Sequence, residues 1–120
     1  MTPTPTLIEI AEAFSRHRFE ETVPHMLDDL EWTLVGERRI VGKADVVAAC
    51  RESAGYLADV RTTFDAFKVV ANEGSVVIDS RAEYLDRDGE ASHVASCDIY
   101  DFVDGRLAGI TSYTVELSPG

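Results

Sequence analysis

Apolar residues recur at two different intervals along this chain, and the interval changes near residue 60. In the first half they recur mainly every three or four positions, which is typical of helices with one buried face. This spacing predicts helices from Leu7 to about Arg18, over a short stretch around Val23–Leu30, and from Lys43 to about Leu57. Thr6 and Glu9 have the spacing of a capping box at the start of the first helix.

Six further segments have the character of β-strands. Two short ones, Glu31–Gly36 and Arg39–Gly42, precede the third predicted helix. Four long ones, in which apolar and polar positions alternate, cover about 61–71, 75–85, 91–103 and 106–117, and turn-forming residues separate them. Because long strands twist strongly, we expect an α+β fold in which a cone-like, curled antiparallel sheet wraps around three N-terminal helices and leaves a central cavity.

Length, charge and cysteine content narrow the class of protein. The chain has 120 residues, so we expect a single domain over 1–120, with 1–5 as a disordered leader. Its formal net charge of −11 argues against nucleic acid or an anionic membrane as a partner. Neither a membrane-spanning run nor a signal-peptide pattern is present in the sequence, so we expect a soluble, cytoplasmic protein with Cys50 and Cys97 reduced.

Asp98 is a lone acid in a segment that otherwise looks like a strand. Pleating directs its side chain the same way as those of Tyr100 and Phe102, toward the apolar side of the sheet. A carboxylate there needs a hydrogen-bond partner or a function, because burying it alone is costly. Ser96, Ser112 and Thr114 share its side if the last two strands pair across the Asp-Gly turn. Asp98 is therefore our candidate for proton transfer, and a purely structural carboxylate is the alternative.

Three segments carry a family resemblance: Leu27-Asp28-Asp29-Leu30-Glu31-Trp32, Val41-Gly42-Lys43-Ala44-Asp45, and Asp98 to Leu107. Through them the chain, from about Leu7 to Leu117, resembles the nuclear-transport-factor-2-like superfamily and, within it, the SnoaL-like and ketosteroid-isomerase-like proteins. The resemblance implies a cystatin-like α+β barrel. It says less about activity, because these proteins include isomerases, dehydratases, cyclases, epoxide hydrolases and non-catalytic binders.

The match to ketosteroid isomerase covers only one of its three catalytic groups. That enzyme uses an aspartate base together with a tyrosine and a protonated aspartate that stabilise an oxyanion. The resemblance puts Thr33 at the position of the base and Cys50 near that of the tyrosine, and only the late aspartate is retained, as Asp98. It therefore argues against steroid isomerisation by that mechanism and leaves Asp98 as the candidate acid or base.

A ligand pocket is the site that we expect in such a cone. Its expected lining, beside the catalytic candidate Asp98, consists of aromatic and small polar side chains: Phe14, Trp32, Thr33, Cys50, Tyr56, Tyr100 and Ser112. For any one aromatic residue, a place in the core is the alternative. His17, His25 and His93 share no metal-ligand spacing, although His25 could face the cavity. No phosphate-binding or nucleophile motif is found, so we expect neither a metal nor a cofactor.

The opposite face of the late strands predicts self-association. Cys97, Ile99, Thr111, Tyr113 and Val115 point away from Asp98 and form an apolar surface that suits a homodimer. Two classes of function stay open. One is an enzyme that binds a small apolar molecule and performs cofactor-independent isomerase, cyclase, dehydratase or hydrolase chemistry through Asp98. The other is a non-catalytic dimeric module for ligand binding or protein interaction.

Overall fold

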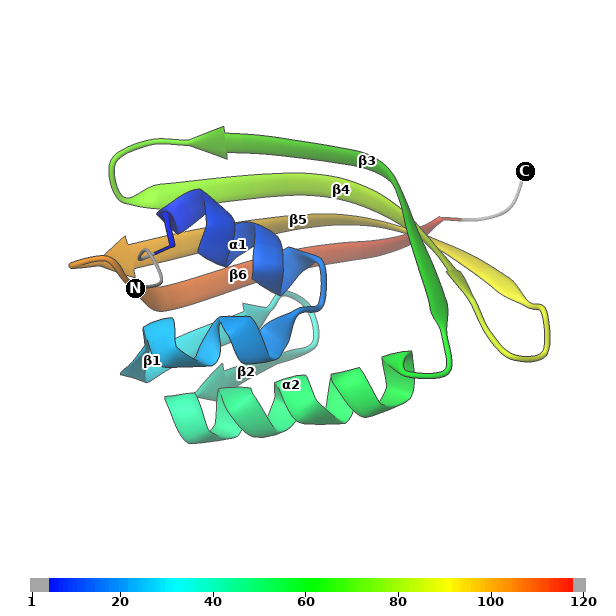
Figure 1. The fold of residues 1–120 in the computed structure, drawn as a ribbon, viewed down its shortest axis with the longest axis horizontal. Helices are drawn as coiled ribbons and strands as arrows, with labels where there is room; N and C mark the ends of the chain where they lie inside the picture. The colour runs from blue at the N-terminus through cyan, green and yellow to red at the C-terminus, as the bar shows by residue number, and fades with distance from the viewer. Residues whose placement is uncertain (1–4, 118–120) are drawn as a thin grey trace.

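The computed structural model describes residues 5–117, so residues 1–4 of the expected leader lie outside the described residues. Within these described residues two helices and six strands follow one another, with two short 3₁₀ turns after the first helix (Figure 1). Their bounds are α1 Leu7–Ser15, η1 Phe19–Glu21, η2 Val23–His25, β1 Met26–Leu34, β2 Arg38–Val41, α2 Lys43–Leu57, β3 Arg61–Ala71, β4 Ser75–Leu85, β5 Ala91–Val103 and β6 Arg106–Leu117.

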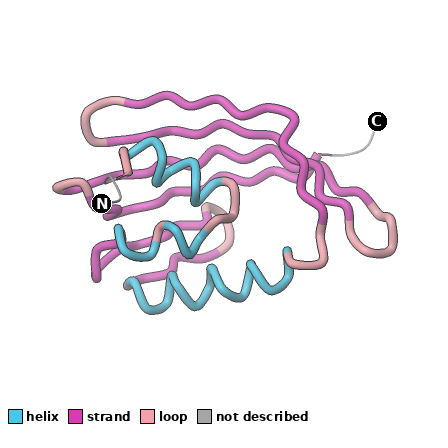
Figure 2. Tube along the Cα trace, viewed as in Figure 1, coloured by secondary structure: helices cyan, strands magenta, loops and turns pink. Residues whose placement is uncertain are grey.

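The six strands form one curled sheet in the order β2-β1-β6-β5-β4-β3. The edge strands β2 and β3 do not pair with each other, so the sheet is not closed. Both helices lie on the same side of this sheet (Figures 1 and 2). The predicted α+β fold with a curled sheet around N-terminal helices is confirmed. One detail differs, since β1 and β6 pair in parallel whereas all other neighbours are antiparallel.

The predicted second helix is wrong. The chain there forms the turns η1 and η2 and then enters β1 at Met26. Met26 and Leu30 are both buried, and their spacing of four fits one face of a helix and one face of a strand equally well. Pro24 stands in the short turn η2, and Asp28 and Asp29 lie exposed between the two buried residues. The third helix and the four long strands have the predicted bounds.

The first helix ends three residues before the predicted Arg18, at Ser15. The amide of Arg18 donates to the carbonyl of Ala13 at 2.8 Å, and the amide of His17 donates to that of Phe14 at 3.0 Å. This pair of bonds is a Schellman motif, in which the residue after the C-cap is left-handed and usually glycine. Here that residue is His17, with a φ of 65°. The chain thus keeps a side chain at a position where a glycine fits more easily.

The core lies between the helices and the concave face of the sheet. It is built from buried apolar residues of α1, η1, β1, β2, α2, β4, β5 and β6: Ile10, Ala11, Phe14, Phe19, Met26, Leu30, Trp32, Ile40, Val46, Ala49, Cys50, Val76, Ile78, Tyr100, Phe102, Leu107 and Ile110. No helix within residues 5–117 has both the length and the apolar composition needed to cross a membrane.

Candidate functional site

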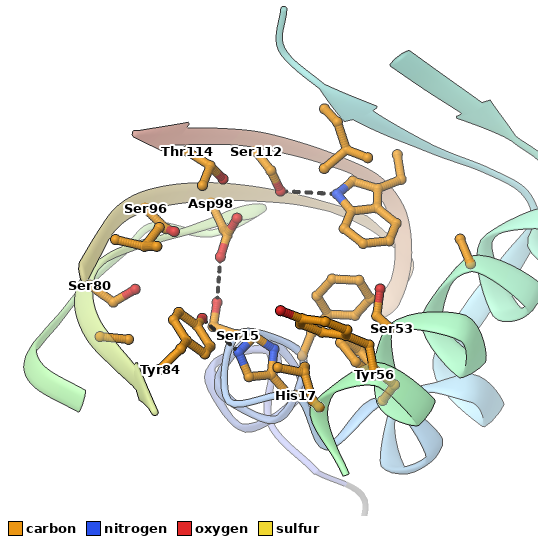
Figure 3. Close-up of a pocket in the computed structure, with 18 of the residues that line it drawn as sticks. Ser15, His17, Ser53, Tyr56, Ser80, Tyr84, Ser96, Asp98, Ser112 and Thr114 are labelled. Carbon is orange, nitrogen blue, oxygen red and sulfur yellow. Dashed lines mark hydrogen bonds between the residues drawn. The ribbon is translucent and has the colours of Figure 1, made fainter. Parts of the chain in front are cut away.

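A cavity of about 660 Å³ opens between the end of α1, the face of α2 and the inner face of the sheet. Its volume falls within the range of small-molecule sites. Strands β4, β5 and β6 supply a polar wall, which includes Ser80, Ser96, Asp98, Ser112 and Thr114 (Figure 3). The helices, the turn η1 and strands β1 and β3 supply most of an aromatic wall: Phe14, Phe19, Trp32, Tyr56 and Phe64. A ligand here would meet a polar side and an apolar side.

The carboxylate of Asp98 is held by a short chain of hydroxyls. Ser15 Oγ donates to Asp98 Oδ2 at 2.9 Å and lies 2.6 Å from the hydroxyl of Tyr100. Since the single proton of Ser15 is given to Asp98, Tyr100 must donate to Ser15. Burial, and then the nearby Asp98 carboxylate, raise the pKa of Tyr100 well above its usual range, so the phenol keeps the proton that it donates. The hydroxyls of Tyr100 and Ser15 thus fix one carboxylate oxygen of Asp98 at the cavity wall.

His17 and Tyr84 form a second polar pair in the same cavity. His17 Nε2 lies 3.0 Å from the Tyr84 hydroxyl. Burial lowers the pKa of His17, and the Asp98 carboxylate opposes that effect only in part. Burial and then Asp98 raise the pKa of Tyr84. Near neutral pH the pair is therefore an uncharged imidazole beside an uncharged phenol, two groups that can donate and accept hydrogen bonds without carrying a charge.

Trp32 is positioned by β6. Its indole Nε1 donates to Ser112 Oγ at 3.0 Å, and its ring meets that of Phe14 edge-on with 5.1 Å between centroids. Ser112 lies directly opposite Asp98 in the β5–β6 pair. The Trp32 ring is therefore held in a fixed orientation on the cavity wall by Ser112 and by its nearly perpendicular packing with Phe14.

The rim of the cavity is mostly acidic. Glu37, Glu52 and Glu116 line it and are exposed, together with Arg38. Among the described residues that line the cavity, Arg38 is the only lysine or arginine. With Asp98 inside, the field at this site disfavours an anionic ligand. Within residues 5–117 there is no group of three or more His, Cys, Asp and Glu side chains that could hold a metal ion.

The cavity brings together five of the eight residues singled out from the sequence: Phe14, Trp32, Tyr56, Asp98 and Ser112. Ser96 and Thr114, expected to share the side of Asp98, line it as well. Tyr56 does so from an exposed position, with 74% of its surface accessible. His25 is not among the lining residues.

Three residues expected in the pocket lie elsewhere. Thr33 follows Trp32 in β1 and so points to the opposite face, where it pairs with Arg39 and Thr111. Cys50 is buried on α2 and lines a separate, smaller pocket of about 220 Å³ against η1. Tyr100 is fully buried in the core, where its hydroxyl lies 2.6 Å from Ser15 Oγ.

Several polar residues of the cavity were not anticipated as lining, among them Ser15, His17 and Ser80. Ser80 and Tyr84 share the inner parity of β4 with Ile78, so the alternation of that strand carried a signal for them. Ser15 and His17 follow the last buried aromatic of α1, where the predicted helix continued to Arg18 without a break. The helix ends early and His17 then turns into the cavity. No glycine stands at this position to indicate the end of the helix in the sequence.

Comparison with known proteins identifies the family. The model of the SnoaL-like domain matches residues 7–110. An NTF2-like protein of unknown function from Cytophaga hutchinsonii is 32% identical, with a TM-score of 0.80 over 90% of this chain and 95% of that one. No match was found among the curated proteins.

Two more distant structures share the fold. An LEH-like epoxide hydrolase from M. tuberculosis is 19% identical, with a TM-score of 0.66 over 87% of this chain and 75% of that one. An NTF2-like protein from Burkholderia xenovorans is 15% identical, with a TM-score of 0.70 over 91% of this chain and 86% of that one. At these identities the likeness concerns the fold alone. The family match and the 32% identical structure together show that this chain belongs to the SnoaL-like family, with an NTF2-like fold.

Proposed function

We propose that this chain is an enzyme that binds a small, largely apolar, uncharged molecule in the cavity and moves a proton of that molecule through Asp98. The observation that carries the proposal is the placement of the carboxylate: it lines the cavity while Ser15 holds one of its oxygens at 2.9 Å. A carboxylate tethered by one oxygen keeps the other for a ligand. The aromatic wall of Phe14 and Trp32 gives the ligand its apolar surface.

The chemistry is general acid–base catalysis without a cofactor. Asp98 Oδ1 takes a proton from an acidic C–H bond of the ligand, the electron pair of that bond moves into the ligand, and the proton returns to another ligand atom. The carboxylate thus ends as it began. The Tyr84 hydroxyl, adjoined by His17 at 3.0 Å, is available to stabilise the negative charge that develops on a ligand oxygen. Isomerisations, cyclisations and eliminations all contain such a step.

Binding without turnover is the second candidate, and the position of Thr33 favours it. The strand position that the resemblance assigns to a base holds a threonine, and its side chain points out of the cavity. Among the described residues, Asp98 is therefore the only carboxylate of the cavity wall inside the acidic rim. A pocket with a single carboxylate can hold a ligand by hydrogen bonds and apolar contact alone.

Deuterium exchange separates the two candidates. The probe is 2-tetralone, a bicyclic ketone with acidic C–H bonds, incubated with the protein in D₂O and followed by proton NMR. We expect the wild-type chain to accelerate the exchange and Asp98→Asn to lower that acceleration by about 10²-fold or more. The matched control is Asp79→Asn, which makes the same change at an exposed position of the neighbouring strand β4.

Each outcome decides between the candidates. Exchange that depends on Asp98 and not on Asp79 supports catalysis. Binding of the ketone with no acceleration over buffer would leave a ligand-binding protein. Equal exchange in Asp98→Asn and wild type would remove Asp98 from the chemistry.

A further inference from the structure

We infer that Ser80, Ser96 and Thr114 form a recognition row for a ligand with two oxygen atoms on alternate carbons of a ring. The inference rests on the proposed function, since it concerns a ligand of the same cavity.

The row is set by the register of three strands. Ser80 of β4 pairs with Ser96 of β5, and Ser96 pairs with Thr114 of β6. All three line the cavity, and Figure 3 shows them on its polar wall beside Asp98. Neighbouring strands are about 4.7–4.9 Å apart, so the row offers hydroxyls at roughly this interval. The accessibility rises along the row, from buried Ser80 through half-buried Ser96 to exposed Thr114.

Ser80 shows that the row is unsatisfied by the protein itself. Its side chain is only 4% exposed, and within residues 5–117 its hydroxyl has no hydrogen-bond partner. Every fully enclosed polar side-chain atom of the described residues does have a partner. The free hydroxyl of Ser80 is therefore reached from the cavity. A hydroxyl in such a place is costly unless water or a ligand pairs with it, and an alanine would fit an apolar wall better.

The neighbouring rows restrict where the ligand lies. On one side is the row of Ile78, Asp98 and Ser112, and on the other that of Ala82, Val94 and Glu116. Along β5 the hydroxyl of Ser96 is two residues from Asp98, a rise of about 6.6 Å. When the oxygens of a ligand ring bind the hydroxyl row, the neighbouring atoms of that ring therefore lie within reach of the Asp98 carboxylate.

The chemistry of the row selects uncharged oxygen atoms. The hydroxyls of the row can donate hydrogen bonds to carbonyl oxygens of a ligand, and can both donate to and accept from its hydroxyl groups. Because these side chains are uncharged, they do not favour an anionic or a cationic ligand. Two oxygens on alternate carbons of a six-membered ring are separated by nearly the spacing of adjacent strands, whereas oxygens on adjacent carbons are much closer together. The acidic rim of Glu37, Glu52 and Glu116 disfavours anionic forms, and Trp32 contributes an aromatic ring to the cavity wall.

Isothermal titration calorimetry at neutral pH tests the row with three related probes: 1,3-dihydroxynaphthalene, 2,3-dihydroxynaphthalene and 2-naphthol. Their apolar surfaces are nearly equal, and they differ in the number and spacing of their oxygens. We expect the wild-type chain to bind the 1,3 isomer about tenfold more tightly than either of the others, the effect of one to two additional hydrogen bonds.

The variant Ser80→Ala/Ser96→Ala/Thr114→Val removes the hydroxyls with little change of shape. We expect it to bind all three compounds within about twofold of one another, while 2-naphthol keeps its wild-type affinity within about threefold. The control is Thr111→Val, which makes the last of these changes on the outer face of β6 and should keep the full preference. Ser96→Ala alone, at a half-buried position, should lose part of the preference and serves if the triple variant does not fold.

The outcomes separate the two proposals. Binding of all three compounds with equal affinity to the wild type overturns the hydroxyl row and leaves the cavity as a ligand site. A preference that survives in the triple variant, or in Ser96→Ala without any loss, also overturns it. Binding of none of the compounds overturns both. A preference retained in Asp98→Asn, with loss of deuterium exchange, supports the row as a feature of binding and the carboxylate as one of chemistry.

Discussion

Replacing His17 by glycine and, separately, by alanine measures the strain at the end of α1. His17 has a φ of 65° in a position where the Schellman motif usually has glycine. Both substitutions remove the imidazole and its contact with Tyr84, so both should lower the free energy of unfolding relative to the wild type. They differ only in the Cβ atom, and it is the difference between them that reports on the backbone.

The magnitude follows from two opposing terms. A residue with a Cβ atom loses about 1–2 kcal/mol in the left-handed region, and glycine loses about 0.5–1 kcal/mol more backbone entropy on folding than alanine. We therefore expect His17→Gly to be more stable than His17→Ala by about 1 kcal/mol. At Gly55 of α2, where φ is not positive and a Cβ would meet open space, the sign reverses: Gly55→Ala should stabilise the chain by about 1 kcal/mol.

Urea unfolding at neutral pH, followed by the fluorescence of Trp32, is the assay. Trp32 is the only tryptophan of the chain and is buried against Phe14, so its emission reports on the core. A difference of 1 kcal/mol corresponds to roughly 4 °C in Tm for a chain of this size. Equal stability of the two position-17 variants, or a more stable His17→Ala, would refute the strain at this position, particularly if Gly55→Ala stabilises as expected.

Three further predictions concern pH, thiols and assembly. Because burial lowers the pKa of His17, the imidazole binds a proton more tightly in the unfolded chain than in the folded one. The free energy of unfolding should therefore rise with pH in the range below about 6.5. Urea titrations at pH 5 and 7 measure this rise, and His17→Gln should remove the part of it that His17 contributes. Burial raises the pKa of the Cys50 thiol to about 12. Mass spectrometry after iodoacetamide treatment of the Ile99→Asp variant at pH 8, in which no dimer covers Cys97, should therefore find Cys97 alkylated well before Cys50, and equal rates would contradict the burial of Cys50. On the outer face of β5 and β6, Tyr113 and Val115 are 47% and 59% exposed, and we propose that a homodimer forms through this face. Sedimentation at micromolar concentration should detect the dimer, and Ile99→Asp should dissociate it. A monomeric wild type would rule the dimer out.

The strongly patterned elements could be read from the sequence. In the four long strands the alternation of polar and apolar residues runs for eleven to thirteen positions and is bounded by turn signals, so their limits came out correctly. The same alternation placed Asp98 on the inner face. Where a short pattern fits two periods, as at Met26 and Leu30, the choice between helix and strand depends on long-range pairing with β6, which local sequence does not contain.

The site was only partly predictable for a related reason. The sequence placed Asp98 and Ser112 on the same side of the sheet, because one short turn connects their strands. Ser15 meets Asp98 across 83 positions of the chain, and no local pattern indicates such a contact. Thr33 and Cys50 were expected from alignment to an enzyme of the same fold, yet strand parity turns one outward and helix packing buries the other.

The parallel pairing of β1 with β6 has a consequence for how the cavity comes into being. Trp32 and Ser112, which form a hydrogen bond across this pair, belong to strands separated by most of the sequence. Contacts of such long sequence separation form late and slow the overall folding rate, because the intervening loop must first be ordered. The part of the wall that Trp32 provides is therefore absent from any intermediate in which only the β3–β6 hairpins have formed. Ligand affinity and completion of the fold should arise in the same kinetic step, and a bound ligand would slow unfolding by stabilising this last-formed seam.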